Sequence, residues 1–455
     1  MTELVENVDQ SGAELDRLAN LAVEVIRRAH AAGASAAEVA ASIDTGLNVN
    51  VRMGEVETVE HTRDRGFGLT VYFGHRKGSA STADLNPASL QATIDQACAI
   101  ASFTEEDPCA GLADAERMAQ AFPDLDLWHP WDIDTEGAVA LGQEIEAAGR
   151  AQPGISNSDG ASVQAGESLS VYANSHGFVG RERGTEHSIS LSLIAGADDR
   201  MQRDYWYDSA RDAAGFMSAH ALGAKAAERT LARLGARGLT TRECAVLFAP
   251  EVARGLIGHL VGAVSGGSLY RHASFLVDHA GKPVMPVWLD LVERPHLPRG
   301  HGSANFDAEG VATVDRPLVE RGVLARYVLG SYSARKLGLA STANAGGIHN
   351  LVVMPGAADG EASDFAGMLR RLGTGLLVTE VMGQGVSLIT GDYSRGAAGF
   401  WVEGGAIAYP VEGVTIAANL RDMFAGIGAV GADVDPRSHL LCGSILMPRM
   451  TVAGD

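Results

Sequence analysis

Four side chains of different chemistry follow one another in the second half of the chain: Asp392, Tyr393, Ser394 and Arg395. A carboxylate, a phenol, a hydroxyl and a guanidinium in one short segment could bind a polar ligand or take part in proton transfer. Residues 386–390 alternate as in a half-buried strand, and residues 391–396 break that alternation. We therefore predict a polar loop that follows a strand, which is how many sites are built. A structural turn in a β-rich domain is the alternative.

A hairpin is predicted directly after this segment. Phe400–Glu403 and Ala406–Tyr409 read as two strands, and Gly404-Gly405 between them is a two-residue turn that tolerates positive φ. Phe400 and Trp401 would lie on the first strand. The stretch from residue 385 to residue 410 is thus predicted to be a rigid element that presents polar and aromatic groups.

Metal binding is not indicated by the histidine pattern. A helical zinc site needs two imidazoles on one helix face and a glutamate beside them. The helix predicted from residue 250 to about residue 264 carries only His259, with Gly258 before it and Ala263 four residues on. One imidazole cannot hold zinc, so a partly buried histidine is the favoured interpretation.

Other catalytic patterns are equally weak. The chain contains no Gly-x-Ser-x-Gly elbow and no phosphate-binding glycine loop, and Ser394 has no histidine close to it in sequence. Cys442 lies in no motif that would lower its pKa, so an inert thiol is expected. Asp307 and Glu309 could share acid–base work, but a solvated turn explains them equally well. Residue chemistry alone does not demonstrate catalysis.

Composition limits the class of protein. The 455 residues predict two or three domains, and the formal charge of −20, from 36 basic and 56 acidic residues, argues against direct binding to nucleic acid or an anionic membrane. Four scattered cysteines favour a reducing compartment. No 18-residue apolar run and no signal peptide are recognised, so we expect a cytoplasmic protein.

The periodicity of the chain predicts an α+β fold. The chain begins with a helix from about residue 11. It continues with four short strands between residues 39 and 73, with a turn at Thr45-Gly46, then a strand at 76–82 and a helix through residue 103. Later segments read as helices at 135–150, up to about 234, and near 415–424, and strands at 161–165, 168–174, 186–195, 244–248 and 444–452. We predict an N-terminal α+β region with an antiparallel sheet and a mainly β C-terminal domain, divided as 1–106, 107–238 and 239–455.

Several segments together resemble one protein family. The residues concerned are Asn174-Ser175-x-Gly177-Phe178, Arg203-Asp204-Tyr205, Phe306-Asp307-x-Glu309-Gly310-Val311, Lys336-Leu337-Gly338, Ser341-Thr342-x-Asn344 and above all GDYSRGAAGFWVE at 391–403. They resemble the TldD/PmbA family, over nearly the whole chain from about residue 19 to residue 454. The long block is specific, and the likeness is to the PmbA branch, also called TldE.

The resemblance implies a function. In that family a TldD subunit, which carries His-Glu-x-x-x-His and a C-terminal cysteine as zinc ligands, pairs with a TldE subunit. The pair is a cytoplasmic metalloprotease of unfolded peptides, including modified peptide-antibiotic precursors and an antitoxin. In this chain Gly258 and Ala263 fall where the two histidines belong, and His259 falls at the glutamate. The Cys-Gly-Lys setting of the catalytic cysteine is missing at Cys442.

By resemblance, this chain is the subunit without metal, so no cofactor is expected in it and zinc is expected in a TldD-like partner. Its expected contacts are that partner, in a heterodimer, or a second copy of itself, and unfolded peptides. Residues expected to face substrate or partner are Asp392, Tyr393, Ser394, Arg395, Phe400 and Trp401. Two alternatives stay open: a regulatory protein that modulates DNA gyrase through protein contacts, and hydrolysis by an unrecognised site.

Overall fold

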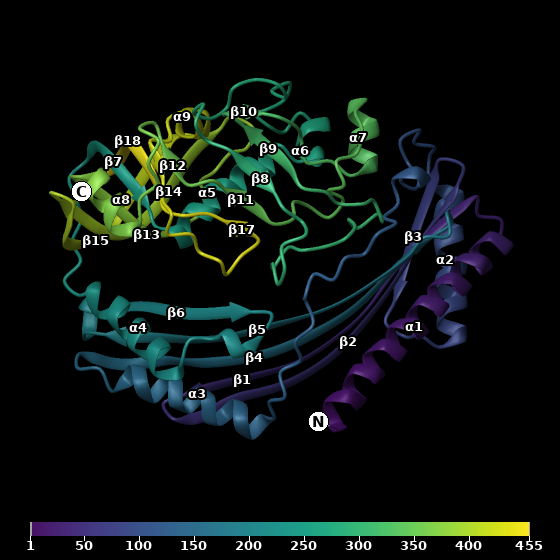
Figure 1. The fold of residues 1–455 in the computed structure, drawn as a ribbon, viewed down its shortest axis with the longest axis horizontal. Coiled ribbons are helices and arrows are strands. Elements are labelled where there is room, and N and C mark those ends of the chain that lie inside the picture. Colours follow the sequence, from purple (N-terminus) through teal and green to yellow (C-terminus); the bar gives the residue numbers. More distant parts are fainter. Residues whose placement is uncertain (1, 455) are drawn as a thin grey trace.

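The structure is a computed structural model that describes residues 2–454, with the side chains of residues 2–9 and 199 left out of the description. A long, curved sheet and its helices form the N-terminal part (Figure 1). The C-terminal part lies above the left and middle of this sheet in Figure 1, on the side away from the helices. The chain therefore places a sheet face and a second domain opposite each other.

The N-terminal sheet is antiparallel, in the order β3-β2-β1-β4-β5-β6. Its strands are β1 (Ala36–Arg52), β2 (Glu55–Phe73), β3 (Arg76–Thr82), β4 (Ile155–Asn174), β5 (Val179–Ala195) and β6 (Gln202–Ala210). Four helices cover it: α1 (Thr2–Ala31), α2 (Pro87–Phe103), α3 (Thr135–Arg150) and α4 (Ala219–Ala232). The regions predicted as 1–106 and 107–238 thus share one sheet, because β1 pairs with both β2 and β4.

Side-chain alternation decides which sheet face the helices cover. On β1 the odd-numbered residues Val39, Ala41 and Ile43 are buried against α1 and α2, and Val49 and Val51 are buried against α3 and α4. The two cores lie at opposite ends of the same face. The even-numbered residues of β1 point to the other face, which remains free to meet the C-terminal domain.

The predicted strands are in part fragments of longer ones. Residues 36–73 form two strands rather than four, and the chain turns at Met53-Gly54, where both φ angles are positive (55° and 83°). The turn predicted at Thr45-Gly46 is wrong: a Cβ at Gly46 would lie 2.8 Å from Oγ1 of Thr62 on the neighbouring strand. Gly46 therefore makes room for a cross-strand side chain and does not reverse the chain. The strands predicted at 161–165 and 168–174 are likewise one, β4.

The C-terminal part is mainly β, and the predicted α+β fold class is confirmed. A seven-stranded sheet has the order β12-β16-β18-β15-β14-β13-β7, and a five-stranded sheet has the order β10-β9-β8-β11-β17. The strands are β7 (Arg242–Phe248), β8 (Leu291–Glu293), β9 (Arg316–Glu320), β10 (Val323–Leu324), β11 (Leu351–Val353), β12 (Gly356–Ala357), β13 (Gly375–Met382), β14 (Asp392–Glu403), β15 (Ala406–Asn419), β16 (Ala429–Val430), β17 (Leu440–Leu441) and β18 (Ile445–Ala453). The helices are α5 (Pro250–Ala263), α6 (Gly266–Tyr270), α7 (Ser331–Leu337), α8 (Phe365–Leu372) and α9 (Leu420–Ala425).

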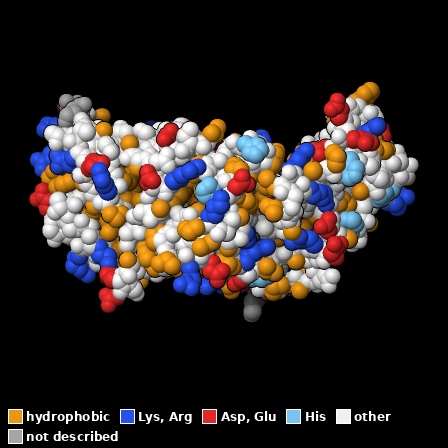
Figure 2. Space-filling view, turned by 90° about the horizontal axis from the view of Figure 1, so that it is seen from above, with side chains coloured by type: hydrophobic (Ala, Val, Ile, Leu, Met, Phe, Trp, Pro, Cys, Tyr) orange, Lys and Arg blue, Asp and Glu red, His pale blue; other side chains and the backbone are white. Residues whose placement is uncertain are grey.

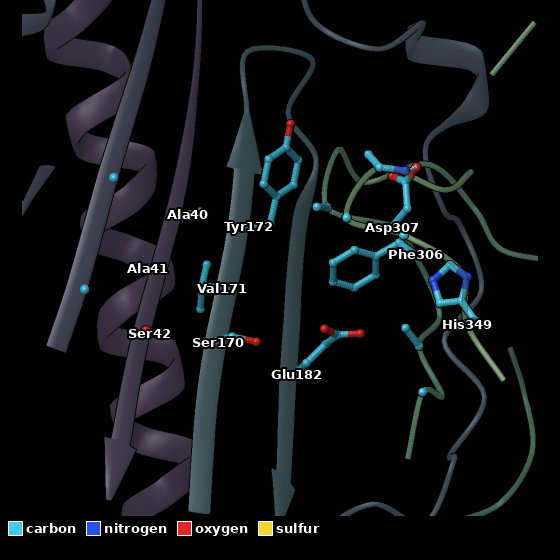
Figure 3. Close-up of a pocket in the computed structure, with 18 of the residues that line it drawn as sticks. Ala40, Ala41, Ser42, Ser170, Val171, Tyr172, Glu182, Phe306, Asp307 and His349 are labelled. Carbon is cyan, nitrogen blue, oxygen red and sulfur yellow. Dashed lines mark hydrogen bonds between the residues drawn. The ribbon is translucent and has the colours of Figure 1, made fainter. Parts of the chain in front are cut away.

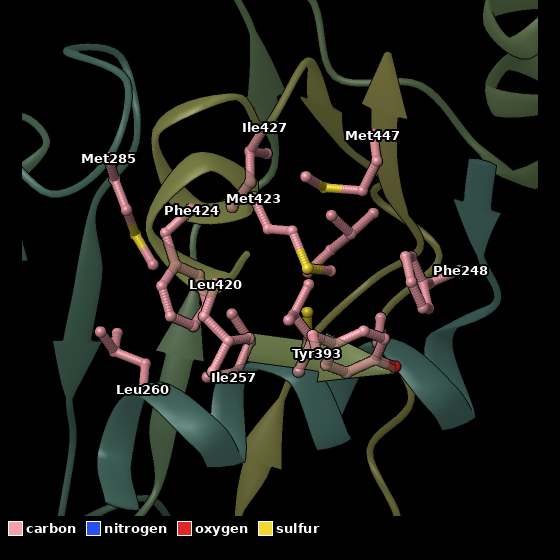
Figure 4. Close-up of a cluster of buried hydrophobic side chains, with 14 of the residues drawn as sticks. Phe248, Ile257, Leu260, Met285, Tyr393, Leu420, Met423, Phe424, Ile427 and Met447 are labelled. Carbon is pink, nitrogen blue, oxygen red and sulfur yellow. The ribbon is translucent and has the colours of Figure 1, made fainter. Parts of the chain in front are cut away.

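The largest core of this part forms around α5 (Figure 4). Ile257 and Leu260 of α5 are buried together with Met423 and Phe424 of α9. Tyr393 of β14 joins the same cluster and is only 4% exposed. The helix at the centre of the core is thus the helix that contains Gly258, His259 and Ala263.

Three predictions for the segment after residue 385 are corrected. Residues 386–390, predicted as a strand, consist of an isolated bridge from Val386 to Tyr393 and a turn at 388–390. Residues 392–396 are not a loop but the start of β14, because they pair with β15 from Asp392↔Asn419 onward. The helix predicted at 415–424 is short, since β15 continues to Asn419 and α9 begins at Leu420. The hairpin turn at Gly404-Gly405 is confirmed, with φ angles of 57° and 79°. Among the described residues, no helix is long and apolar enough to cross a membrane.

Candidate functional site

A cavity of about 700 Å³ lies between the free face of the N-terminal sheet and the loops of the C-terminal domain. The sheet contributes Ser42 of β1, Ser170 of β4 and Glu182 of β5. The facing wall comes from loops 301–308 and 345–349, which carry Phe306 and His349 (Figure 3). Strands of one domain and loops of the other therefore build this cavity together.

A second cavity, of about 680 Å³, follows along the same strands. Its β1 lining, 44–48, continues the 40–42 lining of the first cavity, and its β4 lining, 164–168, continues 170–172. Most of the side chains are hydroxyls, amides and carboxylates, including Asn48, Gln164 and Ser188. We call the two cavities together the sheet groove. Its polar lining can form hydrogen bonds with an extended polar chain.

Glu182 is the carboxylate of the first cavity with the most perturbed ionisation. Burial raises its pKa to about 7, although the Asn305 backbone N–H and His349 favour its charged form. Asp307, on the opposite wall, is also shifted: burial raises its pKa to about 6. Asp307 nevertheless accepts backbone N–H bonds from Glu309 and Ala345 at 2.9 Å each, so it holds the loops in place.

A buried network orients His349 from behind the cavity. Oε1 of Glu293 accepts bonds from His349 Nδ1 at 2.9 Å and from Asn344 Nδ2 at 2.7 Å, and Arg326 pairs with Oε2. Burial opposes the charge of Glu293, but these partners outweigh it and hold its pKa below the ordinary value. The bond from Nδ1 to Glu293 thus fixes the orientation of the His349 ring, which lines the cavity.

An arginine clamp joins the two domains beside the second cavity. The guanidinium of Arg437 stacks on Trp206 and Tyr207 of β6, 4.2 and 4.3 Å from the ring centroids, and donates to the Tyr207 carbonyl at 2.6 Å. Asp435 binds the same guanidinium at 2.8 Å. Arg254 of α5 donates to the Tyr207 hydroxyl at 3.0 Å. These contacts fix the C-terminal domain over the sheet groove.

The helix α5 does not carry a set of zinc ligands. Gly258 has no side chain, and the nearest atom to a Cβ there would be Leu440 Cδ1, at 3.8 Å. Ala263 is buried. His259 contacts the Tyr393 ring, with centroids 6.0 Å apart, and burial lowers its pKa. Burial raises the pKa of the Cys442 thiol, which contacts the Gly443 carbonyl. These residues do not fit zinc, and no group of three His, Cys, Asp or Glu able to hold a metal occurs among the described residues.

The predicted 392–401 residues lie outside the sheet groove. Asp392 and Ser394 are exposed on β14, and Arg395 donates to the Met382 carbonyl at 3.0 Å. Tyr393 and Trp401 are buried at 4% and 6% exposure, so their side chains serve the core of this chain. Phe400 packs with residues of β7 and α8 in a smaller cluster. The substrate- or partner-facing role of these residues stays a prediction.

Sequence reasoning singled out Phe306 and Asp307 of the first cavity but missed the serines of the sheet. Ser168 and Ser170, and Ser188, Ser190 and Ser192, recur at every second position, which places their side chains on one strand face. That signal was visible, but an antiparallel sheet that faces water has the same pattern. Only the position of the second domain distinguishes a groove from a solvated face.

The fold and the groove define a two-domain α+β protein in which a curved antiparallel sheet is partly covered by a β-rich domain. The chain belongs to the PmbA/TldD metallopeptidase family. The models of "PmbA/TldA metallopeptidase" domain 1, central domain and C-terminal domain match residues 37–101, 128–234 and 241–454. These matches agree with the family resemblance of the sequence.

Individual relatives support the same family. The chain is 49% identical to Metalloprotease PmbA of Escherichia coli O157:H7 over 419 residues, and this aligned region covers 92% of each protein. It is 46% identical to a Metalloprotease PmbA homolog of Haemophilus influenzae, over 97% of this chain and 96% of that one. A crystal structure from Bacteroides thetaiotaomicron, described as a candidate modulator of DNA gyrase, has 26% identity and a TM-score of 0.90, and covers 96% of this chain and 98% of that one. TldE from Thermococcus kodakarensis shares the fold at 19% identity and a TM-score of 0.82, over 95% of this chain and all of that one.

Proposed function

We propose that the chain is the subunit without metal of a two-subunit TldD/TldE-type metalloprotease. In this role it shapes the chamber that holds an unfolded peptide beside a zinc site supplied by a TldD-like partner. One observation carries the proposal: the sheet groove is intact, while α5 presents Gly258 and Ala263 where imidazole ligands would be needed. A binding surface without ligands for zinc suits a subunit that completes another chain's active site.

The dimensions of the groove suit an extended peptide. Its β1 lining runs from Ala40 to Asn48, which at about 3.3 Å per residue corresponds to roughly 26 Å. An extended segment of about eight residues has this length. Serine hydroxyls and side-chain amides along the sheet can bond to peptide main chain irrespective of sequence. A folded domain would not enter such a groove, so an unfolded substrate is favoured.

A partner surface is also available. The segment 382–395 exposes Met382 at 45% and Ile389 at 64%, next to the exposed Asp392 and Ser394. Figure 2 shows apolar side chains gathered left of centre over the C-terminal domain, with acidic and basic groups interspersed. Mixed apolar and polar surface is typical of non-obligate protein interfaces. We place the contact with the TldD-like subunit on this segment; a homodimer through it is the alternative assembly.

The test combines assembly, metal content and activity. The chain should co-elute with a TldD-type partner, zinc should be found in the partner's peak, and the mixture should cleave an unfolded peptide. Ser170→Trp should fill the groove and lower cleavage without changing co-elution, whereas the matched Ser170→Ala should leave cleavage close to wild type. Equal cleavage by the partner alone would refute the proposal. Stoichiometric zinc in the isolated chain, lost in His259→Ala, would instead support hydrolysis by this chain.

Regulation of DNA gyrase through protein contacts is the second candidate, on the description of the Bacteroides relative. The charge of −20 disfavours direct DNA binding in this role. Capture of purified gyrase by the chain without any TldD partner would favour this candidate. Capture that requires the partner would favour the protease.

A further inference from the structure

Glu182 is a partly buried carboxylate in the first cavity, whose other ionisable lining groups, apart from Tyr172, are Asp307, His301 and His349. Figure 3 shows its carboxylate pointing from β5 toward the loops that carry Phe306 and His349. No lysine or arginine forms an ion pair with Glu182 among the described residues. Its neighbours in sequence, Arg181 and Arg183, point to the opposite face of β5, where they contact Asp16 and Trp128. The protein therefore places a partly buried carboxylate in a cavity without a lysine or arginine partner, and the groups that favour its charge are the Asn305 backbone N–H and His349.

The walls around Glu182 limit the ligands that would suit it. Phe306, which is 6% exposed and packs against Phe178, contributes an apolar wall, and Ser42 and Ser170 offer hydroxyl groups that can accept or donate. An anion would be repelled by Glu182 and by Asp307 on the opposite wall. A metal ion would lack ligands, since the described residues include no group of three suitable donors. A compact organic cation on an apolar stem can pair with the carboxylate and lie against the apolar wall.

We propose that this cavity binds a primary ammonium group carried on an apolar stem, with Glu182 as its ion-pair partner. Two parts of a peptide have this chemistry: the free amino terminus and the lysine side chain. The identification of the ligand as part of a peptide rests on the proposed function; the ammonium site itself does not. The cavity lies at one end of the sheet groove, so an ammonium held there would set the register of the chain along it.

The site can be tested by calorimetry on the intact chain at pH 7.5, where both kinds of amine are mainly protonated. The probes are n-butylammonium, a lysine-free octapeptide with a free amino terminus, its N-acetylated form, and an N-acetylated form with one lysine. Glu182→Gln removes the charge and keeps the shape. Glu57→Gln is the matched control, because Glu57 is exposed on the same sheet and lines neither cavity.

At least one amine-bearing peptide should bind the wild type about tenfold more tightly than the acetylated, lysine-free peptide, which is the size of one charge-assisted hydrogen bond. Glu182→Gln should abolish that difference, and Glu57→Gln should preserve it. The peptide whose tighter binding is lost in Glu182→Gln identifies the source of the ammonium as the free amino terminus, the lysine side chain, or both. Two results would overturn the site. In the first, Glu182→Gln still prefers the amine-bearing peptides over the acetylated, lysine-free peptide. In the second, the wild type shows no such preference and its binding of n-butylammonium does not depend on Glu182.

The same experiment separates this inference from the proposed function. If n-butylammonium binds in a Glu182-dependent way and no peptide binds at all, the ammonium site stands and the peptide-binding role is refuted. If all peptides bind equally well and n-butylammonium does not bind, the groove role stands and the ammonium site is refuted.

Discussion

The network around Glu293 allows a quantitative test of how the cavity wall is held. Glu293→Ala removes the carboxylate that pairs with Arg326 and accepts hydrogen bonds from Asn344 and His349. The side chain of Glu293 is 1% exposed and that of Arg326 is 12% exposed, so solvent cannot replace the lost partner. Removing one member of a buried ion pair costs about 3–5 kcal/mol, because the other charge is left uncompensated.

For the C-terminal domain, a loss of this size corresponds to a fall in Tm of about 6–20 °C, at roughly 2–4 °C per kcal/mol. Thermal and urea unfolding of the full chain measure it. The exposed pair Glu243–Arg449 provides the control, since Glu243→Ala should cost less than about 1 kcal/mol. The double variant Glu293→Gln/Arg326→Met should be more stable than the sum of its single variants predicts. Additivity within about 0.5 kcal/mol would refute the coupling.

The contribution of Glu293 to stability should decrease at acid pH. The folded-state pKa of Glu293 is lowered from about 4.5, so its contribution to stability is complete above that pH and is lost as the pH falls through the folded-state pKa. The stability gap between wild type and Glu293→Gln should therefore narrow below about pH 4.5. A gap that stays constant down to pH 3 would contradict the assigned ionisation.

Three further predictions concern single features. Arg437→Lys should raise protease sensitivity and hydrogen exchange at β6, because an ammonium cannot reproduce the stacked, multiply bonded guanidinium over Trp206; unchanged exchange would contradict the clamp. Gly404→Ala should cost about 1 kcal/mol of stability, and Gly405→Ala should lower the urea midpoint further, because of these two glycines only Gly405 would place a Cβ 2.9 Å from a backbone atom, Cα of Arg370. Equal losses in the two variants would contradict this reasoning. The pKa of Glu182 is raised to about 7 in the folded state, so the stability of the wild type should fall as the pH rises from about 4.5 to 7. Glu182→Gln should weaken that trend, which urea midpoints at pH 5 and pH 8 measure.

Local sequence signals predicted the elements that depend on local chemistry. The helix after Asn86 is capped by that side chain, which accepts the Ser89 N–H at 2.8 Å, and its predicted end near residue 103 agrees with α2. The Gly404-Gly405 turn is a second example. Strand length was not predictable in the same way, because Gly46 makes room for Thr62 and for the Ala165 carbonyl, which lie on the two neighbouring strands. Cross-strand contacts of this kind are not present in any window of the sequence.

The candidate site was even harder to predict from the sequence than the strand lengths. The family block at 391–403 drew attention to β14, whereas the groove combines Ser42, Glu182 and His349, which are separated by more than a hundred residues at each step. None of the three lies in a catalytic motif. Their common feature is the position of one domain over another, and this arises only from tertiary packing.

The pairing of β1 with β4 has a consequence during synthesis. When β1 and β2 have left the ribosome, β1 still lacks its second neighbour, because β4 begins at Ile155 and β1 ends at Arg52. At typical elongation rates of about 5–20 residues per second, roughly a hundred residues correspond to about 5–20 s. Through that interval the nascent chain carries an open edge of strand-forming sequence, a known hazard for aggregation. A chaperone that shields this edge during translation would raise the yield of folded protein, and slowing elongation between residues 52 and 155 would lower it.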